Sequence, residues 1–158
     1  MIVSPESGIR ESASSLLLPD VMVPTETLRL ASQISEIRRL ALAVEKFAAR
    51  HGVQGNAAHH IILAADELIT NAIEHNPPPP DLQMTVMLRL ERKRLIMEIS
   101  YQGTPFDPTV ETKAPELDAP IEDRPIGGLG VHFAKTLLDG LSYVRRQGTN
   151  HLTLTKNL

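Results

Sequence analysis

Apolar and polar residues alternate with two different periods along the chain, and the period changes near its middle. In the first half, apolar residues recur with the spacing that is typical of amphipathic helices. The first stripe of this kind consists of Ile34, Ile37, Ala41, Val44 and Ala48. Ser32 precedes the stripe as a predicted helix cap and Gly52 ends it, while residues 25–30 predict a strand before it.

A second helix is predicted after Gly55, with Asn56 as its cap. At about 100° per residue, its apolar arc contains Ile61, Ala65, Leu68, Ile69 and Ala72. The opposite arc contains Leu63, Glu67, Thr70, Asn71 and Glu74. We expect the helix to end at Asn76, because the prolines that follow cannot continue it.

After these prolines the period changes to two, which predicts strands. The alternating apolar residues are Met84, Val86, Leu88 and Leu90. Residues 92–93 are predicted to form a turn, and residues 95–100 to pair back as a second strand. Residues 103–128 have no clear period and contain several prolines, so they predict a long loop, which in a compact domain is usually functional or disordered.

A third helix is predicted over residues 131–139, before Gly140. Its inward residues are Val131, Ala134 and Leu138. Two strands, 141–146 and 151–156, are predicted to close the chain through a connection at 147–150. Strands and helices in this order predict an α+β fold: a two-layer α/β sandwich whose mixed, mostly antiparallel sheet has its helices on one face.

Composition limits the class of protein. A chain of 158 residues suits one domain, and we assign residues 25–158 to it, with residues 1–24 as a flexible leader. Because cysteine is absent, thiolate metal sites and cysteine nucleophiles are excluded. The formal charge of −3 gives no electrostatic reason to expect nucleic-acid binding, and no apolar run is long enough to cross a bilayer. We therefore expect a soluble, cytoplasmic protein.

Two segments carry candidate chemistry around the predicted helices. Glu67 and Asn71 lie four residues apart, so a carboxylate and an amide share one helix face and can serve as proton acceptor and hard-metal ligand. The alternative is an ordinary solvated face with a polar pair. Gly127, Gly128 and Gly130 precede the third helix, where backbone N–H groups and the helix dipole favour an anion; the alternative is a flexible loop end.

A third candidate segment covers residues 100–108, at the end of a predicted strand. Gly103 would let the backbone pass close to a flat ligand, and Phe106 could pack beneath that ligand. The alternative for Phe106 is a side chain that fills the core. The chain contains neither the glycine spacing of the Rossmann fingerprint nor a P-loop, so any nucleotide must bind by another scheme.

In order and spacing, three sequence boxes resemble those of the GHKL (Bergerat-fold) nucleotide-binding superfamily. The boxes are E-L-I-T-N-A-I-E-H, G-T-P-F-D-P and P-I-G-G-L-G-V-H with a following K-x-L-x-D. Within that superfamily, residues 25–158 most resemble the anti-sigma-factor serine kinases of bacterial partner-switching systems, of the RsbW and SpoIIAB type.

The resemblance implies a role for each matching residue. Glu67 would be the catalytic base, and Asn71 would hold the Mg²⁺ that bridges the phosphates of ATP. Gly103 and Phe106 would lie beside the adenine, and Thr149 would reach its edge through a water. Arg124 would lie near the terminal phosphate. A lid over residues 109–126 would end in the phosphate-binding glycines Gly127, Gly128 and Gly130.

The resemblance also implies partners. A kinase of this type phosphorylates a serine of a small anti-anti-sigma protein with a STAS domain and sequesters a sigma factor or a similar client. It binds neither nucleic acid nor membrane directly, and it commonly forms a homodimer.

One residue departs from the family pattern. The family has an aspartate two residues before the glycine of the second box, where it accepts a hydrogen bond from the adenine amino group, and this chain has Tyr101. The alternative function is therefore a non-catalytic partner-switch binding module of the same fold, with weak or no ATP binding. A sensor-kinase catalytic domain is a third reading, and it predicts a phosphoacceptor helix pair, which we do not find before residue 25.

Overall fold

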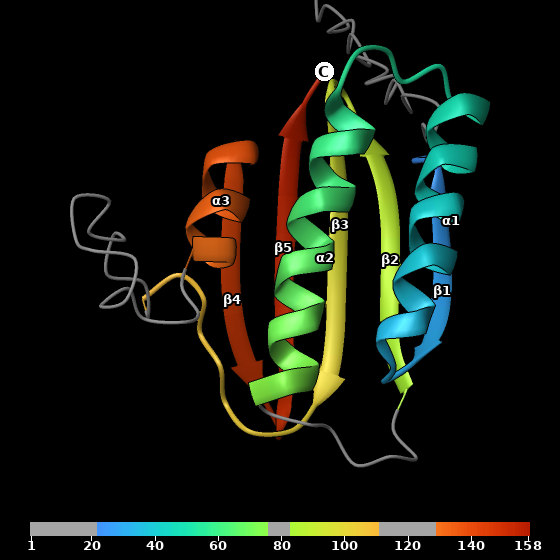
Figure 1. The fold of residues 1–158 in the computed structure, drawn as a ribbon. Helices are drawn as coiled ribbons and strands as arrows, with labels where there is room; N and C mark the ends of the chain where they lie inside the picture. Colours follow the sequence, from blue (N-terminus) through green and yellow to red (C-terminus); the bar gives the residue numbers. More distant parts are fainter. Residues whose placement is uncertain (1–21, 76–82, 111–128) are drawn as a thin grey trace, which may run out of the picture.

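A computed structural model describes residues 22–75, 83–110 and 129–158; residues 1–21, 76–82 and 111–128 lie outside this description (Figure 1). The predicted leader therefore lies almost wholly outside it. In chain order, the elements are β1 (Thr25–Ala31), the short 3-10 helix η1 (Ile34–Glu36), α1 (Ile37–Arg50), α2 (Ala57–His75), β2 (Gln83–Glu91), β3 (Arg94–Gln102), α3 (Leu129–Leu137), β4 (Gly140–Arg146) and β5 (Thr149–Asn157).

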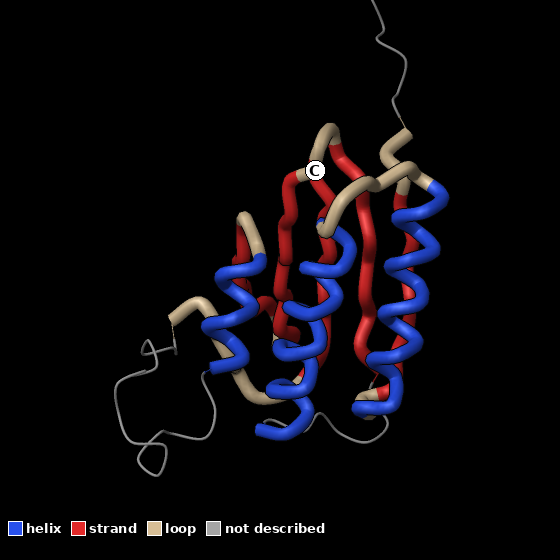
Figure 2. Tube along the Cα trace, turned by 45° about the horizontal axis from the view of Figure 1, so that its top comes forward, coloured by secondary structure: helices blue, strands red, loops and turns tan. Residues whose placement is uncertain are grey.

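The five strands form one sheet in the order β1-β2-β3-β5-β4, and every neighbouring pair is antiparallel. The helices α1, α2 and α3 all cover the same face of this sheet, with α2 between the other two (Figures 1 and 2). This arrangement confirms the predicted α+β fold with two layers.

The core lies between the sheet and the helices. The strand residues that face the helices alternate with residues on the open face, as the period of two predicts. The buried strand residues include Met84, Val86, Leu88, Leu95, Met97, Ile99, Leu152 and Leu154. From α2, the whole predicted apolar arc from Ile61 to Ala72 is buried, and from α3 the predicted Val131 and Ala134 are buried. Leu138, just beyond α3, is buried as well.

The predicted stripe of the first helix was partly wrong. Ile34 is 51% exposed, because residues 34–36 form the separate 3-10 turn and α1 begins only at Ile37. Leu40 and Phe47 are buried instead, together with the predicted Val44 and Ala48. Ser32 does not occupy the cap position, since the residues before η1 and α1 are Gln33 and Glu36.

The connection between β4 and β5 is shorter than the predicted four residues. Gln147 and Gly148 alone form the turn, and both have positive φ, 48° and 79°. Two residues with positive φ fit the tight hairpin turn that matches the twist of antiparallel strands. As a result, β5 begins at Thr149, and Asn150 becomes a strand residue whose side chain faces the helices.

Candidate functional site

Two polar side chains on the last three turns of α2 have no partner among the described residues. Glu67 and Asn71 are both half-buried, and neither makes a hydrogen bond or an ion pair within the part of the chain that the structure describes. Nearby, Thr70 donates instead to Asp66, at 3.2 Å. Half-buried polar groups usually have partners. Both groups are therefore free to bind water or a ligand.

The first turn of α3 lies directly against the carboxylate of Glu67. A Cβ atom added at Gly130 would lie 2.0 Å from Oε2 and 2.9 Å from Cδ of Glu67, far inside van der Waals contact. A side chain larger than glycine at this position would therefore have to displace the carboxylate of Glu67. The helices α2 and α3 lie side by side in Figures 1 and 2.

This contact places Glu67 beside a helix N-terminus. Because α3 begins at Leu129, the backbone N–H of Gly130 is among the first four of the helix, which have no acceptor within it. These N–H groups and the helix dipole attract anions. Asn71 lies one turn further along the same face of α2. The structure thus brings together a carboxylate, an amide oxygen and a set of backbone donors.

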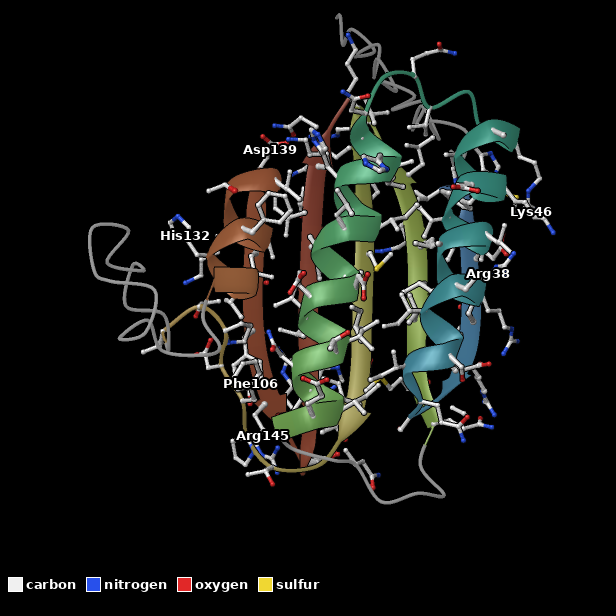
Figure 3. The ribbon with its side chains drawn as sticks, in the orientation of Figure 1. Arg38, Lys46, Phe106, His132, Asp139 and Arg145 are labelled. Atoms are coloured by element: carbon white, nitrogen blue, oxygen red, sulfur yellow. The ribbon has the colours of Figure 1, made fainter. Side chains whose placement is uncertain are left out.

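A polar network around the buried Asn150 lies at the lower end of the sheet in Figure 3, where Arg145 and Phe106 are labelled. Asn150 is fully buried, and its Oδ1 accepts hydrogen bonds from the Tyr143 hydroxyl at 2.7 Å and from Arg145 Nη1 at 2.8 Å. Arg145 Nη1 also donates to the carbonyl of Gly103 at 2.9 Å, and Asn150 Nδ2 donates to that of Thr104 at 3.1 Å. The network therefore fixes the backbone after β3.

Tyr101 lies next to this network, since its Cα pairs with that of Asn150 across the sheet. Its side chain is 2% exposed and belongs to the core cluster, and its hydroxyl has no hydrogen-bond partner among the described residues. Burial raises the pKa of Tyr101 to about 12; Tyr143 adds to this rise and Arg145 opposes it. The phenol is therefore neutral at any physiological pH.

The remaining predicted site residues fall into three groups. Gly103 and Phe106 lie on the segment after β3: Gly103 has a φ of 144°, and Phe106 packs partly buried against the core, as the alternative for this residue expected. Thr149 is in β5, where strand alternation puts its side chain on the sheet face opposite to that of Asn150. Arg124, Gly127 and Gly128 lie outside the described residues.

The start of the predicted lid is attached to α3. Lys135 Nζ donates a hydrogen bond to the carbonyl of Thr109 at 3.0 Å, and Thr109 in turn donates to Asp107 Oδ1 through its N–H and its hydroxyl. The segment after β3 is therefore held at two places, by Arg145 and Asn150 at its beginning and by Lys135 near residue 109.

Sequence reasoning missed the network of Tyr143, Arg145 and Asn150. The only signal for it was the pair Gln147-Gly148, which permits a two-residue turn and so brings Asn150 into register with Arg145 and Tyr101. Within residues 22–75, 83–110 and 129–158, no cluster of three or more His, Asp or Glu residues suggests a metal site built from the protein alone. No helix among the described residues is long and apolar enough to span a membrane.

The fold is a two-layer sandwich in which a helix N-terminus lies beside a carboxylate, with an amide one turn away on the same helix as the carboxylate. Residues 30–156 match the family described as the histidine kinase-like ATPase domain, and the chain belongs to this family. Because the match spans most of the described elements, from the end of β1 to the end of β5, it concerns the whole sandwich.

Two protein kinases and one crystal structure are similar to this chain and agree with its assignment to the histidine kinase-like ATPase family. The chain is 30% identical over 134 residues to the serine/threonine-protein kinase BtrW of Bordetella bronchiseptica, which covers 84% of this chain and 94% of that protein. It is 29% identical over 138 residues to the serine-protein kinase RsbW of Listeria innocua, covering 82% and 85%. The crystal structure of the RsbU and RsbW domains of Rv1364c from Mycobacterium tuberculosis matches with a TM-score of 0.61 at 18% identity, over 85% of this chain and 32% of that one. That structural likeness shows the fold.

Proposed function

We propose that this chain is a regulatory serine/threonine-protein kinase and anti-sigma factor that uses Mg-ATP to phosphorylate a serine of an anti-anti-sigma protein with a STAS domain. The observation that supports this proposal most is the contact between Glu67 and Gly130, beside an unpartnered Asn71. The names of the relatives, serine/threonine-protein kinase BtrW and serine-protein kinase RsbW, support the same activity.

The groups that the structure assembles suit phosphoryl transfer. In this reaction, the bond between the γ-phosphorus and the bridging oxygen of ATP breaks, and a new bond forms to the serine oxygen of the partner. Glu67 accepts the proton of that serine hydroxyl, and it is available for this role because it is bonded to no other described residue. The N–H groups at the start of α3 would donate hydrogen bonds to the phosphate oxygens and stabilise their negative charge. Catalysis then depends mainly on positioning and electrostatics.

The residues present also fit a magnesium ion. Mg²⁺ prefers oxygen ligands, keeps several of its waters, and is usually held by one or two protein groups together with substrate phosphates. The half-buried amide of Asn71, with no partner among the described residues, is a suitable oxygen donor of this kind. When bound, the metal would neutralise phosphate charge.

The partners that we propose follow from the same relatives. The client of the kinase would be a sigma factor or a similar regulator, sequestered while the anti-anti-sigma protein is phosphorylated. Such a protein acts in the cytoplasm, without direct contact with nucleic acid or membrane, and can form a homodimer.

The kinase proposal is tested with the whole chain, Mg²⁺, γ-labelled ATP and a STAS-domain protein of the same organism. We expect label on a serine of that protein, and we expect Glu67→Gln to abolish transfer while it keeps nucleotide binding. Glu74→Gln is a matched control, because Glu74 lies on the same helix but is exposed. Equal transfer by Glu67→Gln and the unaltered protein would contradict the role of Glu67.

The buried ring of Tyr101 favours a second candidate, a partner-switch module of the same fold that binds its partners without productive use of ATP. In this candidate the buried ring of Tyr101 takes the space at the end of β3 where the family has a carboxylate. Calorimetry with Mg-ATP separates the two functions. Tight binding by the unaltered protein eliminates the non-catalytic candidate, whereas no binding, with affinity restored by Tyr101→Asp, supports it.

A further inference from the structure

One large apolar side chain is exposed on the two helices that carry the candidate site. Of the described side chains on α2 and α3, Phe133 is the only large apolar one that is exposed, at 45%. Its ring therefore presents apolar surface to water beside the site. Aromatic side chains are enriched in the interfaces between proteins, where a few of them carry much of the binding energy.

Phe133 lies on the side of α3 that faces α2. Gly130 contacts Glu67, and Phe133 follows Gly130 by three residues, which places it about 60° away around the helix axis and about 4.5 Å further along. The rotation leads away from Val131 and Ala134, which are buried in the core. The ring therefore lies at the outer border of the contact between the two helices.

The helices α2 and α3 run in opposite directions. In Figures 1 and 3, α2 runs downwards, whereas α3 runs upwards to Asp139. Because Gly130 lies against Glu67, the next turn of α3, which carries Phe133, lies opposite the preceding turn of α2. That turn carries Leu63, which is half-buried and lies on the same face of α2 as Glu67. Phe133 and Leu63 thus form an apolar patch one turn above the Glu67 carboxylate.

Glu67 stands between this apolar patch and the polar end of the site. Leu63 lies one turn before Glu67 on α2, and Asn71 lies one turn after it. In phosphoryl transfer, the attacking and leaving oxygens lie roughly in line, on opposite sides of the phosphorus. With the phosphates held towards Asn71, the attacking hydroxyl approaches Glu67 from the side of the patch.

We infer that Phe133 is a specificity-determining residue that contacts the acceptor protein and positions its serine at Glu67. This inference rests on the proposed function, because it concerns the acceptor of the same phosphoryl transfer. The complementary feature of the acceptor is an apolar side chain close to the serine, since contact between the two removes apolar surface from water. An acceptor with a charged side chain at that place binds weakly, because the ring offers the charge no partner.

Steady-state kinetics with the STAS-domain protein of the same organism, at saturating Mg-ATP, test this role. Phe133→Ala should raise the KM for the acceptor roughly tenfold, the effect of truncating a central interface side chain, with kcat and the Kd for ATP nearly unchanged. Phe133→Leu keeps a bulky apolar side chain and should recover most of the lost affinity. A thermal melt checks that both variants fold. An unchanged KM in folded Phe133→Ala overturns the inference and leaves the kinase proposal intact.

Val144→Ala is the matched control for Phe133→Ala. Val144 is exposed to a similar degree, 42%, but it lies on the sheet face opposite to the helices, because the adjacent Tyr143 and Arg145 both bond to Asn150 on the helix side. The KM of this variant for the acceptor should equal that of the unaltered protein. An equal rise of KM in both variants would show that the effect is not specific to Phe133.

A second measurement does not depend on phosphate transfer. With p-benzoylphenylalanine in place of Phe133, irradiation should cross-link the whole chain to the purified STAS-domain protein close to its serine, and the same group in place of Val144 should not. Cross-links far from that serine, or none from position 133, overturn the inference. Because the non-catalytic candidate also binds its partners, this result decides the role of Phe133 even if the unaltered protein transfers no phosphate, an outcome that would contradict the kinase proposal alone.

Discussion

Replacing Gly130 by alanine should separate the stability of this protein from its activity. The added Cβ would lie 2.0 Å from Glu67 Oε2 and 3.6 Å from Glu67 Cβ, so only the end of a flexible side chain has to move. Moving it off its preferred rotamer costs about 0.5–1.5 kcal/mol. Alanine in place of glycine in a helix contributes about 0.5–1 kcal/mol in the opposite direction. The two effects nearly cancel, and Tm should change by no more than about 4 °C.

The expected effect of Gly130→Ala on catalysis is much larger. The methyl group occupies the present position of the Glu67 carboxylate, and a catalytic group displaced by about 1 Å can cost on the order of 100-fold in rate. We therefore expect phosphate transfer to fall by roughly that factor, measured with labelled ATP and the STAS-domain acceptor alongside a thermal melt.

Gly140→Ala is the control for Gly130→Ala. Its Cβ would meet only Thr155, at 3.4 Å from Cβ and 3.7 Å from Oγ1, which are ordinary contacts that do not involve Glu67. Transfer by this variant should match that of the unaltered protein. If Gly130→Ala folds and transfers phosphate at an unaltered rate, the position of the Glu67 carboxylate against α3 does not matter, and our reasoning about this contact is refuted.

Three further predictions concern the groups around the site and the end of the sheet. Asn150→Ala removes the buried oxygen that accepts hydrogen bonds from Tyr143 and Arg145. It should destabilise the protein by about 1–3 kcal/mol, which lowers Tm by roughly 3–9 °C. An unchanged Tm would show that the network does not stabilise the fold. Tyr101 should ionise near pH 12 in an ultraviolet titration. Since folding raises this pKa, the neutral phenol stabilises the protein below about pH 10, and this contribution is lost as pH rises through 12. The hydrogen bond from the backbone N–H of Asn157 lowers the pKa of Asp139 most, and Lys156 lowers it further. Asp139→Asn should therefore be less stable than the unaltered protein above about pH 4. In urea melts, this difference should vanish as pH falls through the lowered pKa.

The sequence alone predicts most of this fold because its patterns are local. The apolar arc of α2 follows from a period of 3.6 residues, and every member of that arc is buried. The failure at Ile34 also has a local cause, since residues 34–36 form a 3-10 turn and α1 begins only at Ile37. Periodicity cannot show such a change, because the 3-10 turn and the α-helix place residues at different angles.

The site was only half predictable, because it depends on contacts between distant segments. Glu67 and Asn71 stand four residues apart in one helix, so their common face follows from the sequence. The contact of Glu67 with Gly130 joins α2 to α3, and nothing in the spacing of these residues gives its distance. The network of Tyr143, Arg145 and Asn150 depends on the length of one turn, and an error of two residues in that turn conceals it.

Calorimetric titration with ATP, in the presence of Mg²⁺ and again with a chelator, tests directly whether α2 and α3 hold a metal–nucleotide complex between them. We expect one nucleotide per chain, bound only with Mg²⁺, and an affinity at least about tenfold lower in Asn71→Ala, because that amide is the oxygen ligand we assign to the protein. Binding that is equally tight with the chelator and in Asn71→Ala would contradict the assignment, and the absence of binding by the unaltered protein would contradict the kinase as a whole.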